Sequence, residues 1–178
     1  MGVRLFGLLL VAAACAWLGA AVSTASAEKT PDAVSAAPVR PIASSEKSCP
    51  LPRRHRPAFE RASRDTVLPL SLLVSVALVE SNLRSGVRSH TGASGLLQVM
   101  PATARELGLD PDHPPSNVLA GARYLRLMLD RFDSADLALA AYNAGPTAVA
   151  KAGGAPSAET LTYVANVTRQ WRKLHGCN

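Results

Sequence analysis

The segment from Pro69 to Val79 is almost wholly apolar, and an ionisable side chain, Glu80, follows it directly. Leu73, Ala77 and Glu80 are spaced i, i+4 and i+7, so on a helix these three side chains share one face. That face is otherwise apolar, which predicts that the Glu80 carboxyl points into a pocket. The ordinary alternative is a glutamate at a helix end that points to water.

A carboxyl group at the end of an apolar face is suited to acid chemistry. Removal from water raises the pKa of a carboxyl group, so the group can hold a proton at neutral pH. A proton held in this way can be given to a leaving group, as general acid catalysis requires. Glu80 alone does not decide between the two interpretations, but three segments downstream favour catalysis.

The first 27 residues have the organisation of a secretory signal peptide. Arg4 supplies a positive charge, residues 5–21 form an apolar core, and residues 25–27 form a small-x-small cleavage site. We therefore expect export to a periplasm or to the cell wall and extracellular space, with no membrane span left after cleavage. Two alternatives stay open: a retained membrane helix, for which the run is a little short, and lipidation at Cys15.

Residues 28–47 are mostly Ala, Ser and Pro, which predicts a flexible tether. Residues 48–178 are then long enough for one compact domain. Cys49 and Cys177 bracket this domain, and in an exported protein such a pair predicts a disulfide bond, with two free thiols as the alternative. The four histidines are scattered and no CxxC or HExxH occurs, so we expect neither a metal nor a cofactor.

The chain is moderately basic, with 19 Lys and Arg side chains against 13 Asp and Glu. Basic residues gather in residues 53–56 (RRHR) and again at Arg169, Arg172 and Lys173. A positive surface attracts anionic polymers, and outside the cytoplasm we expect a cell-wall glycan as partner, not nucleic acid. Each cluster is equally well explained as an ordinary solvated surface.

The domain shows helical patterns and few alternating segments, so we predict an all-α fold. Helices are expected over residues 69–80, 101–107, 118–132 with Asn117 as cap, 136–142, 146 to the Gly153–Gly154 pair, and 157–174. Predicted inner faces carry Val118, Ala122, Leu125, Leu129 and Phe132 on the third of these helices, and Leu161, Val164, Thr168, Trp171 and Leu174 on the last. The polar, glycine-rich residues 84–95 predict a loop or a small irregular sheet beside Glu80.

Three further segments carry amides and aromatic hydroxyls. Residues 95–101 (GLLQVMP) hold Gln98, residues 141–146 (AYNAGP) place Tyr142 and Asn143 at a helix end, and residues 159–164 (ETLTYV) place Tyr163 on the last helix. Amides bind hydroxyl and N-acetyl groups and rings stack on sugars, so the set favours a sugar chain as ligand. Taken singly, the amides are also explained as caps and the tyrosines as partly buried core residues.

With these motifs in this order, the chain resembles the soluble lytic transglycosylase family, whose catalytic domain has a goose-type-lysozyme-like fold. The matches run from about residue 65 to residue 167: Glu80-Ser81, GLLQVMP, AYNAGP, and Glu159-Thr160 followed by Tyr163-Val164. Two positions depart from the family pattern, Leu97 in place of Met and His90 in place of Pro. The resemblance implies catalysis by Glu80 and substrate contacts from Ser81, Gln98, Met100, Tyr142, Asn143 and Tyr163, with the Tyr163 hydroxyl bonded to the Glu80 carboxyl.

The resemblance also implies a reaction. Family members cut the β-1,4 bond between N-acetylmuramic acid and N-acetylglucosamine in peptidoglycan without water and leave a 1,6-anhydro ring. Residues 81–105 contain no acid, which agrees with a single carboxyl, since the usual hydrolases need a second one about 5–9.5 Å away. A distant acid that folds back would remove this argument.

Two other functions stay open: a hydrolytic muramidase or chitinase on the same fold, and a non-catalytic glycan-binding or secretion-assembly protein. We expect a monomer, and the sequence leaves open a partner in cell-envelope assembly.

Overall fold

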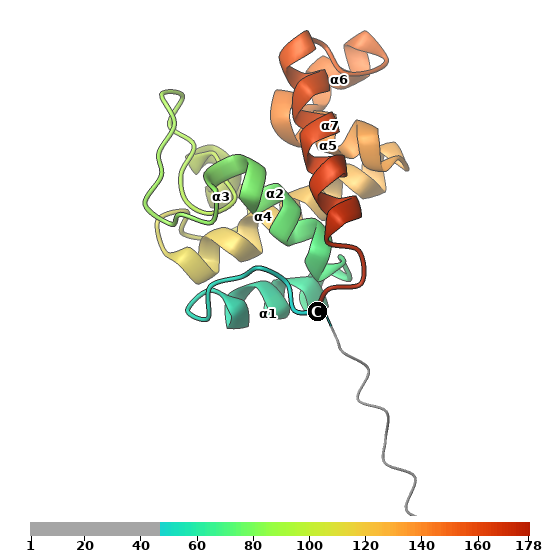
Figure 1. Cartoon of the computed structure of the whole chain (residues 1–178). Coiled ribbons are helices and arrows are strands. Elements are labelled where there is room, and N and C mark those ends of the chain that lie inside the picture. Colours follow the sequence, from blue (N-terminus) through green and yellow to red (C-terminus); the bar gives the residue numbers. More distant parts are fainter. Residues whose placement is uncertain (1–46) are drawn as a thin grey trace, which may run out of the picture. The chain divides into compact units, whose positions relative to one another are not determined.

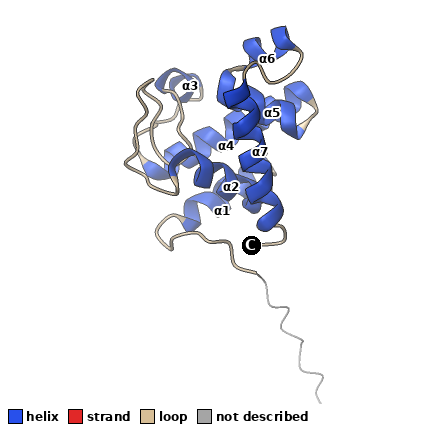
Figure 2. Cartoon of the chain, turned by 45° about the horizontal axis from the view of Figure 1, so that its top comes forward, coloured by secondary structure: helices blue, strands red, loops and turns tan. Residues whose placement is uncertain are grey.

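A computed structural model describes residues 47–178 (Figure 1). The signal peptide, Cys15 and all but the last residue of the tether lie outside the described residues, so those expectations stay predictions. The described part has seven helices and no strand, which confirms the all-α prediction (Figure 2). The helices are α1 (Arg56–Thr66), α2 (Leu70–Ser81), α3 (Pro101–Glu106), α4 (Pro114–Phe132), α5 (Ala135–Ala144), α6 (Pro146–Ala152) and α7 (Ala158–Lys173).

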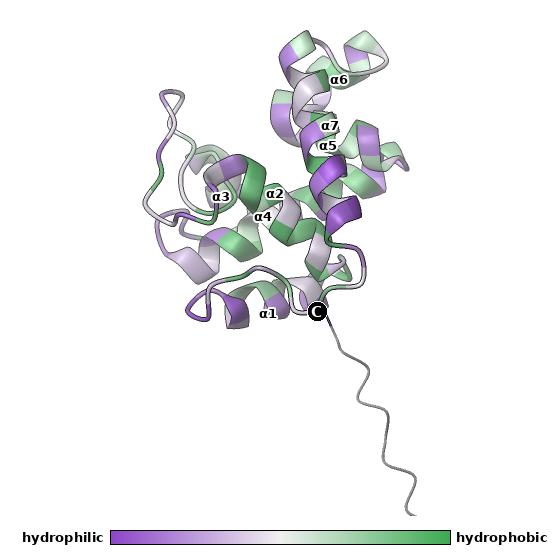
Figure 3. Cartoon of the chain, in the orientation of Figure 1, coloured by the Kyte–Doolittle hydropathy of each residue, from purple (hydrophilic) through white to green (hydrophobic). Residues whose placement is uncertain are grey.

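Helix α2 lies in the centre of the domain, between α1 and α7. Every residue from Ser71 to Ala77 is buried, so the helix is enclosed on all sides and not on one face as the spacing predicts. Its polar side chains are satisfied internally: the Ser75 hydroxyl donates to the Ser71 carbonyl oxygen at 2.6 Å. In Figure 3 this helix is largely apolar, whereas α1 and the last turns of α7 contain many hydrophilic residues. Glu80 is therefore carried by the most enclosed element of the domain.

The sequence analysis does not predict helix α1. Its buried stripe consists of only Phe59, Ala62 and Thr66, in a segment otherwise rich in arginine. Pro57 occupies its first turn, where a missing N–H costs nothing. The helix packs along α4 and against α2, so it forms the underside of the core.

The two ends of the domain are joined. Cys49 and Cys177 form the predicted disulfide bond, with their Cα atoms 4.9 Å apart. Beside it, the Cys49 N–H donates to the Asn178 carbonyl at 3.2 Å, and the Asn178 N–H donates to the Lys47 carbonyl at 3.1 Å. The start of the domain is thus paired with its last residues by one covalent bond and two backbone hydrogen bonds.

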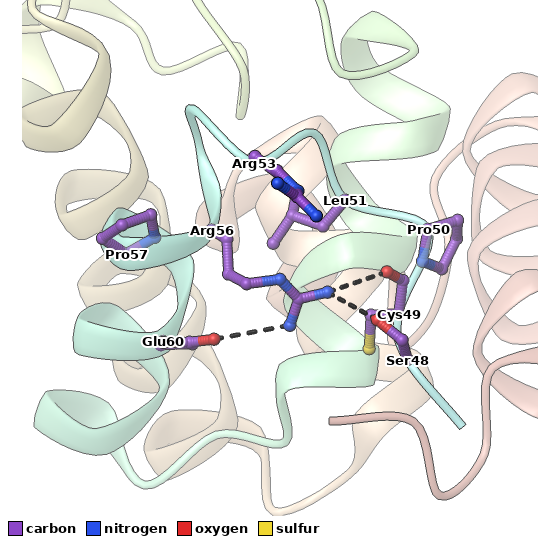
Figure 4. Close-up of a pocket in the computed structure, with 8 residues that line it drawn as sticks. All are labelled: Ser48, Cys49, Pro50, Leu51, Arg53, Arg56, Pro57 and Glu60. Carbon is purple, nitrogen blue, oxygen red and sulfur yellow. Dashed lines mark hydrogen bonds and ion pairs between the residues drawn. The ribbon is translucent and has the colours of Figure 1, made fainter. Parts of the chain in front are cut away.

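Arg56 reinforces this junction from the start of α1. Its guanidinium donates to the Ser48 hydroxyl at 2.8 Å and to the Cys49 carbonyl at 3.1 Å, and it also pairs with Glu60 at 3.4 Å (Figure 4). The hollow around these groups has a volume of about 660 Å³. Of the two arginines that line it, Arg56 is bound to the junction, and Glu80 is not part of its lining.

Two details of the predicted helices are wrong. Asn117 does not cap α4, because the helix begins at Pro114 and Asn117 lies inside it with no exposed surface. Leu161 does not face the core, because 60% of its surface is exposed. The buried face of α7 runs instead through Thr160, Tyr163 and Val167.

The glycine-rich segment between α2 and α3 takes the form of a loop. Two isolated antiparallel bridges, Arg88 with Ser94 and Ser94 with Val99, fold it back on itself. No helix among residues 47–178 is both long and apolar enough to cross a bilayer.

Candidate active site

Glu80 stands in the last turn of α2 and lines a cleft of about 570 Å³. The Tyr163 hydroxyl, from α7, donates a hydrogen bond of 2.7 Å to its Oε1 atom, as predicted. Burial of the carboxyl raises the pKa of Glu80 to about 7, and the Tyr163 hydrogen bond offsets part of that rise. The carboxyl therefore exchanges its proton near neutral pH.

Three parts of the chain complete the cleft. They are residues 89–91, 93, 98 and 100 of the long loop, residues 142–144 at the end of α5, and residues 157, 159 and 160 at the start of α7. A second hollow of about 260 Å³ shares Gln98, Met100, Tyr142 and Asn143 with this cleft and extends it to Tyr124. The two hollows together form a groove that continues from Glu80 to Tyr124, which suits an extended ligand.

Tyr142 is held in place by the backbone of the loop. Its hydroxyl donates to the Leu97 carbonyl at 2.7 Å, and its ring lies 5.4 Å from that of Tyr124. Burial, with the nearby Glu80 carboxyl, raises the pKa of the Tyr142 hydroxyl well above its usual value, so it stays protonated. The ring is left to form a wall of the groove.

Gln98 is fixed by the hydrogen bonds of its side chain. Its Nε2 donates to the Val87 carbonyl at 3.0 Å and to the Gly95 carbonyl at 2.9 Å. Its backbone has φ of +44°, in the left-handed region, which those bonds stabilise. Both amide protons are occupied, so the side-chain oxygen is the atom left to accept a hydrogen bond from a ligand.

Met100 and Asn143 are both exposed in the groove, and Met100 has 42% of its surface accessible. Ser81 is different: it is only 3% exposed and is absent from the cleft lining. Its hydroxyl lies 2.8 Å from the Leu96 carbonyl oxygen and 3.1 Å from that of Ala77. Ser81 therefore ties the loop to α2, and its predicted contact with substrate stays a prediction.

Asn117 is a site-building residue that the sequence analysis misassigned. Its Oδ1 accepts from the Leu97 N–H at 2.9 Å, and its Nδ2 donates to the Ser94 carbonyl at 2.8 Å and to the Pro111 carbonyl at 2.9 Å. Gly95 has φ of +79°, and a Cβ there would overlap the Asn117 side chain. The buried amide and the glycine together seat the loop on α4.

Gly121 is a second residue that the sequence analysis did not identify. A Cβ at this position would lie 2.6 Å from the Leu97 side chain and 2.8 Å from the Tyr142 hydroxyl. The absence of a side chain therefore lets α4 approach the loop and the tyrosine at once. A glycine within an otherwise regular helical pattern was the available indication.

Glu159 brings a second carboxylate to the cleft. It lies in the first turn of α7, four residues before Tyr163, and it is exposed. The run without acids from residue 81 to residue 105 gives no indication of this, because the last helix folds back to the site. No group of three or more His, Cys, Asp or Glu side chains in residues 47–178 is arranged to hold a metal ion.

The comparisons with known proteins agree on one family. The profile described as "Transglycosylase SLT domain" matches residues 57–162. This chain belongs to that family. Its fold also matches the X-ray structure of the lytic transglycosylase Slt from Pseudomonas aeruginosa, solved as an inactive Glu-to-Gln mutant, with a TM-score of 0.61 and 30% identity over 72% of this chain and 25% of the other.

Two curated relatives each match part of this chain. The membrane-bound lytic murein transglycosylase F of Cellvibrio japonicus is 35% identical over 49% of this chain and 19% of its own length. The transglycosylase of Enterobacteria phage PRD1 is 37% identical over 65% of this chain and 42% of its own length. This SLT-domain chain thus spans less than half the length of either relative.

Proposed function

We propose that this SLT-domain protein is a peptidoglycan lytic transglycosylase, with Glu80 as its single general acid and base. The observation that carries the proposal is the Glu80 carboxyl: largely buried, with a pKa raised to about 7, and lining the groove. A group with that pKa can donate and accept a proton at neutral pH. The inactive Glu-to-Gln form of the Pseudomonas relative agrees with one essential carboxyl.

In the first step, the protonated Glu80 gives its proton to the glycosidic oxygen between N-acetylmuramic acid and N-acetylglucosamine. The C1–O4 bond breaks, and the N-acetylglucosamine leaves with a free 4-hydroxyl. Positive charge develops at C1 of the muramoyl ring, where the substrate's own N-acetyl group stabilises it. The Glu80 carboxylate left behind keeps the Tyr163 hydroxyl as hydrogen-bond donor.

In the second step, the Glu80 carboxylate takes the proton from the muramoyl 6-hydroxyl, whose oxygen attacks C1. A 1,6-anhydro ring forms, no water is consumed, and Glu80 is protonated again by the proton from the 6-hydroxyl. Tyr163 does not itself transfer this proton, because burial and the adjacent carboxyl raise the pKa of its hydroxyl well above the usual value.

Gln98, Met100, Tyr142 and Asn143 fit the role of sugar contacts. They line both parts of the groove, and they offer an amide oxygen, a thioether, an aromatic ring and a second amide. The expected ligand is a glycan strand of peptidoglycan, and the expected location is outside the cytoplasm. We expect a monomer in solution, delivered to the wall by its tether or by an assembly partner.

A hydrolytic muramidase is the second candidate, and Glu159 is the observation that favours it. A second carboxylate in the lining is what a hydrolase needs to activate water. Digestion of purified peptidoglycan in water enriched in oxygen-18 separates the two reactions by mass spectrometry. The proposal expects anhydro ends without label, from the wild type and from Glu159→Gln alike. Labelled reducing ends that disappear in Glu159→Gln would make this protein a hydrolase.

A further inference from the structure

The cleft contains a single basic side chain. Its lining includes two carboxyl groups, Glu80 and Glu159, and His90 is the one residue there whose side chain can carry a positive charge. His90 is exposed, and its side chain makes no hydrogen bond within residues 47–178. Its environment therefore leaves the imidazole free to meet a ligand.

His90 is presented by a closed turn. The Ser89 N–H donates to the Ala93 carbonyl at 2.8 Å, and the Gly92 N–H donates to the Ser89 carbonyl at 3.1 Å. The Ser89 hydroxyl accepts from the Ala93 N–H at 3.0 Å and lies 2.8 Å from the Thr91 hydroxyl. These hydrogen bonds hold the backbone of the turn, so the proline that the family pattern has at position 90 is not needed to hold it. The side chain at this position can therefore contact a ligand.

The distribution of charge on the glycan indicates which group of the ligand His90 can bind. Both sugar rings of peptidoglycan are neutral, and negative charge is confined to the side arm of the muramoyl unit. That arm ends in a free lactyl carboxylate or, when a peptide is attached, in the carboxylates of the peptide. A carboxylate that enters a cleft with two acids is repelled unless a cation meets it.

We propose that His90 is a specificity-determining residue that binds a carboxylate on the muramoyl side arm. The inference rests on the proposed function only in that a glycan strand occupies this cleft. It adds a preference for charged over neutral side arms, which Glu80, Gln98 and Tyr142 do not provide. The imidazole donates an N–H to the carboxylate, and it is the one side chain of the cleft lining that can carry the opposite charge.

The experiment compares three glycans in one mildly acidic buffer. The first glycan bears peptides, the second is stripped to free lactyl carboxylates, and the third is stripped and has those carboxylates converted to neutral methyl amides. KM is measured for the wild type, His90→Gln and His90→Lys. His175→Gln is the matched control, because His175 is also exposed but lies after α7, away from the cleft.

The expected result is a KM about fivefold higher for His90→Gln with a charged glycan, the upper range for an exposed ion pair. The neutral glycan and the His175→Gln control should show no change, His90→Lys should restore the wild-type KM, and salt near 1 M should remove the difference. A rise with the peptide-bearing glycan alone assigns the carboxylate to the peptide, and a rise with the stripped glycan alone assigns it to the lactyl group.

The role of His90 would be overturned if the ratio of KM for His90→Gln to KM for the wild type were equal for all three glycans. A ratio of one for every glycan is included in this outcome. The products report separately on the reaction: labelled reducing ends together with a His90-dependent KM would refute the lytic reaction and leave His90 in place. Anhydro ends with equal KM ratios would do the opposite. Absence of cleavage and of binding for every glycan would overturn both.

Discussion

Burial of the Glu80 carboxyl favours proton transfer at neutral pH and lowers the stability of the folded protein. Enclosure at the end of α2 raises the pKa of its carboxyl to about 7, which suits proton transfer at neutral pH. The same enclosure disfavours the ionised form in the folded protein, so the site weakens the fold when Glu80 loses its proton. Both effects can be measured at this one residue.

The first prediction concerns stability and pH. Because the pKa of Glu80 is higher in the folded chain than its ordinary 4.5, the folded state binds more protons between about pH 4.5 and 7. The free energy of unfolding of the wild type should therefore fall through that window relative to Glu80→Gln, by roughly 3 kcal/mol in total. Urea unfolding of both proteins at pH 4.5 and pH 8 tests this, and parallel pH curves would contradict it.

The second prediction concerns Tyr163. Its hydrogen bond to Oε1 lowers the pKa of Glu80, so Tyr163→Phe should raise that pKa further. The fall of kcat/KM with rising pH, which reports loss of the acid, should move to higher pH, and the rate should drop less than in Glu80→Gln. Tyr142→Phe is the control, because its hydroxyl is bonded to the Leu97 carbonyl and its removal should leave the midpoint unchanged. If the midpoint of the pH profile of kcat/KM did not move in Tyr163→Phe, the Tyr163 hydroxyl would not lower the pKa of Glu80.

At the scale of elements, the groove depends on how closely the loop, α4 and the end of α5 approach each other. Gly121 permits that approach, and the Asn117 amide satisfies the buried polar groups that it creates. Neither residue reaches the cleft lining. Their effect on a ligand passes through Leu97, whose carbonyl receives the Tyr142 hydroxyl.

The third prediction is that Gly121→Ala harms both stability and activity. Alanine improves helix propensity by about 1 kcal/mol, but overpacking of a close contact costs about 1–3 kcal/mol. With Leu97 at 2.6 Å and Tyr142 at 2.8 Å, the second effect should win, and thermal unfolding should shift down together with kcat/KM. Gly86→Ala is the control, because a Cβ there meets nothing within 4 Å. Equal behaviour of the two variants would contradict this account.

Elements were predictable where apolar residues dominate the pattern. Helix α2 could be placed from its composition, but α1 could not, because Phe59 and Ala62 are its only buried apolar residues. Asn117 precedes an apolar stripe as a cap would, and only its partners across the loop show that it is buried. The apolar pattern of α7 predicts Leu161 in the core, whereas Thr160 is buried, because sequence alone does not show which polar side chains find partners.

At the scale of the whole described domain, the place of the Glu80 carboxyl in a cleft could be predicted from the sequence, and its surroundings only in part. Glu80 and Tyr163 come from segments 83 residues apart, and their motifs suggested the bond that the structure shows. Ser81 belongs to the same motif as Glu80, yet its hydroxyl turns to the loop backbone. Adjacent residues on a helix point in different directions, so a motif does not assign one role to all its members.

The fourth prediction concerns the junction of the two ends. The disulfide bond closes a separation of 128 residues, for which the chain-entropy model gives about 4–5 kcal/mol as an upper value. Replacing both Cys49 and Cys177 by Ser should lower the melting temperature clearly, while kcat/KM at low temperature stays within about twofold, since neither residue lines the cleft. Unchanged stability, or activity lost from a folded variant, would contradict it.

The rate of glycan cleavage by Glu80→Gln is the most direct test of the central claim. The substitution keeps the size of the side chain and its capacity to accept from Tyr163, and it removes the transferable proton and the negative charge of the carboxylate. With a circular dichroism spectrum equal to that of the wild type, the account predicts a loss of at least ~100-fold in turnover of purified peptidoglycan. Turnover within tenfold of the wild type would contradict the assignment of Glu80 as the acid and base of this protein.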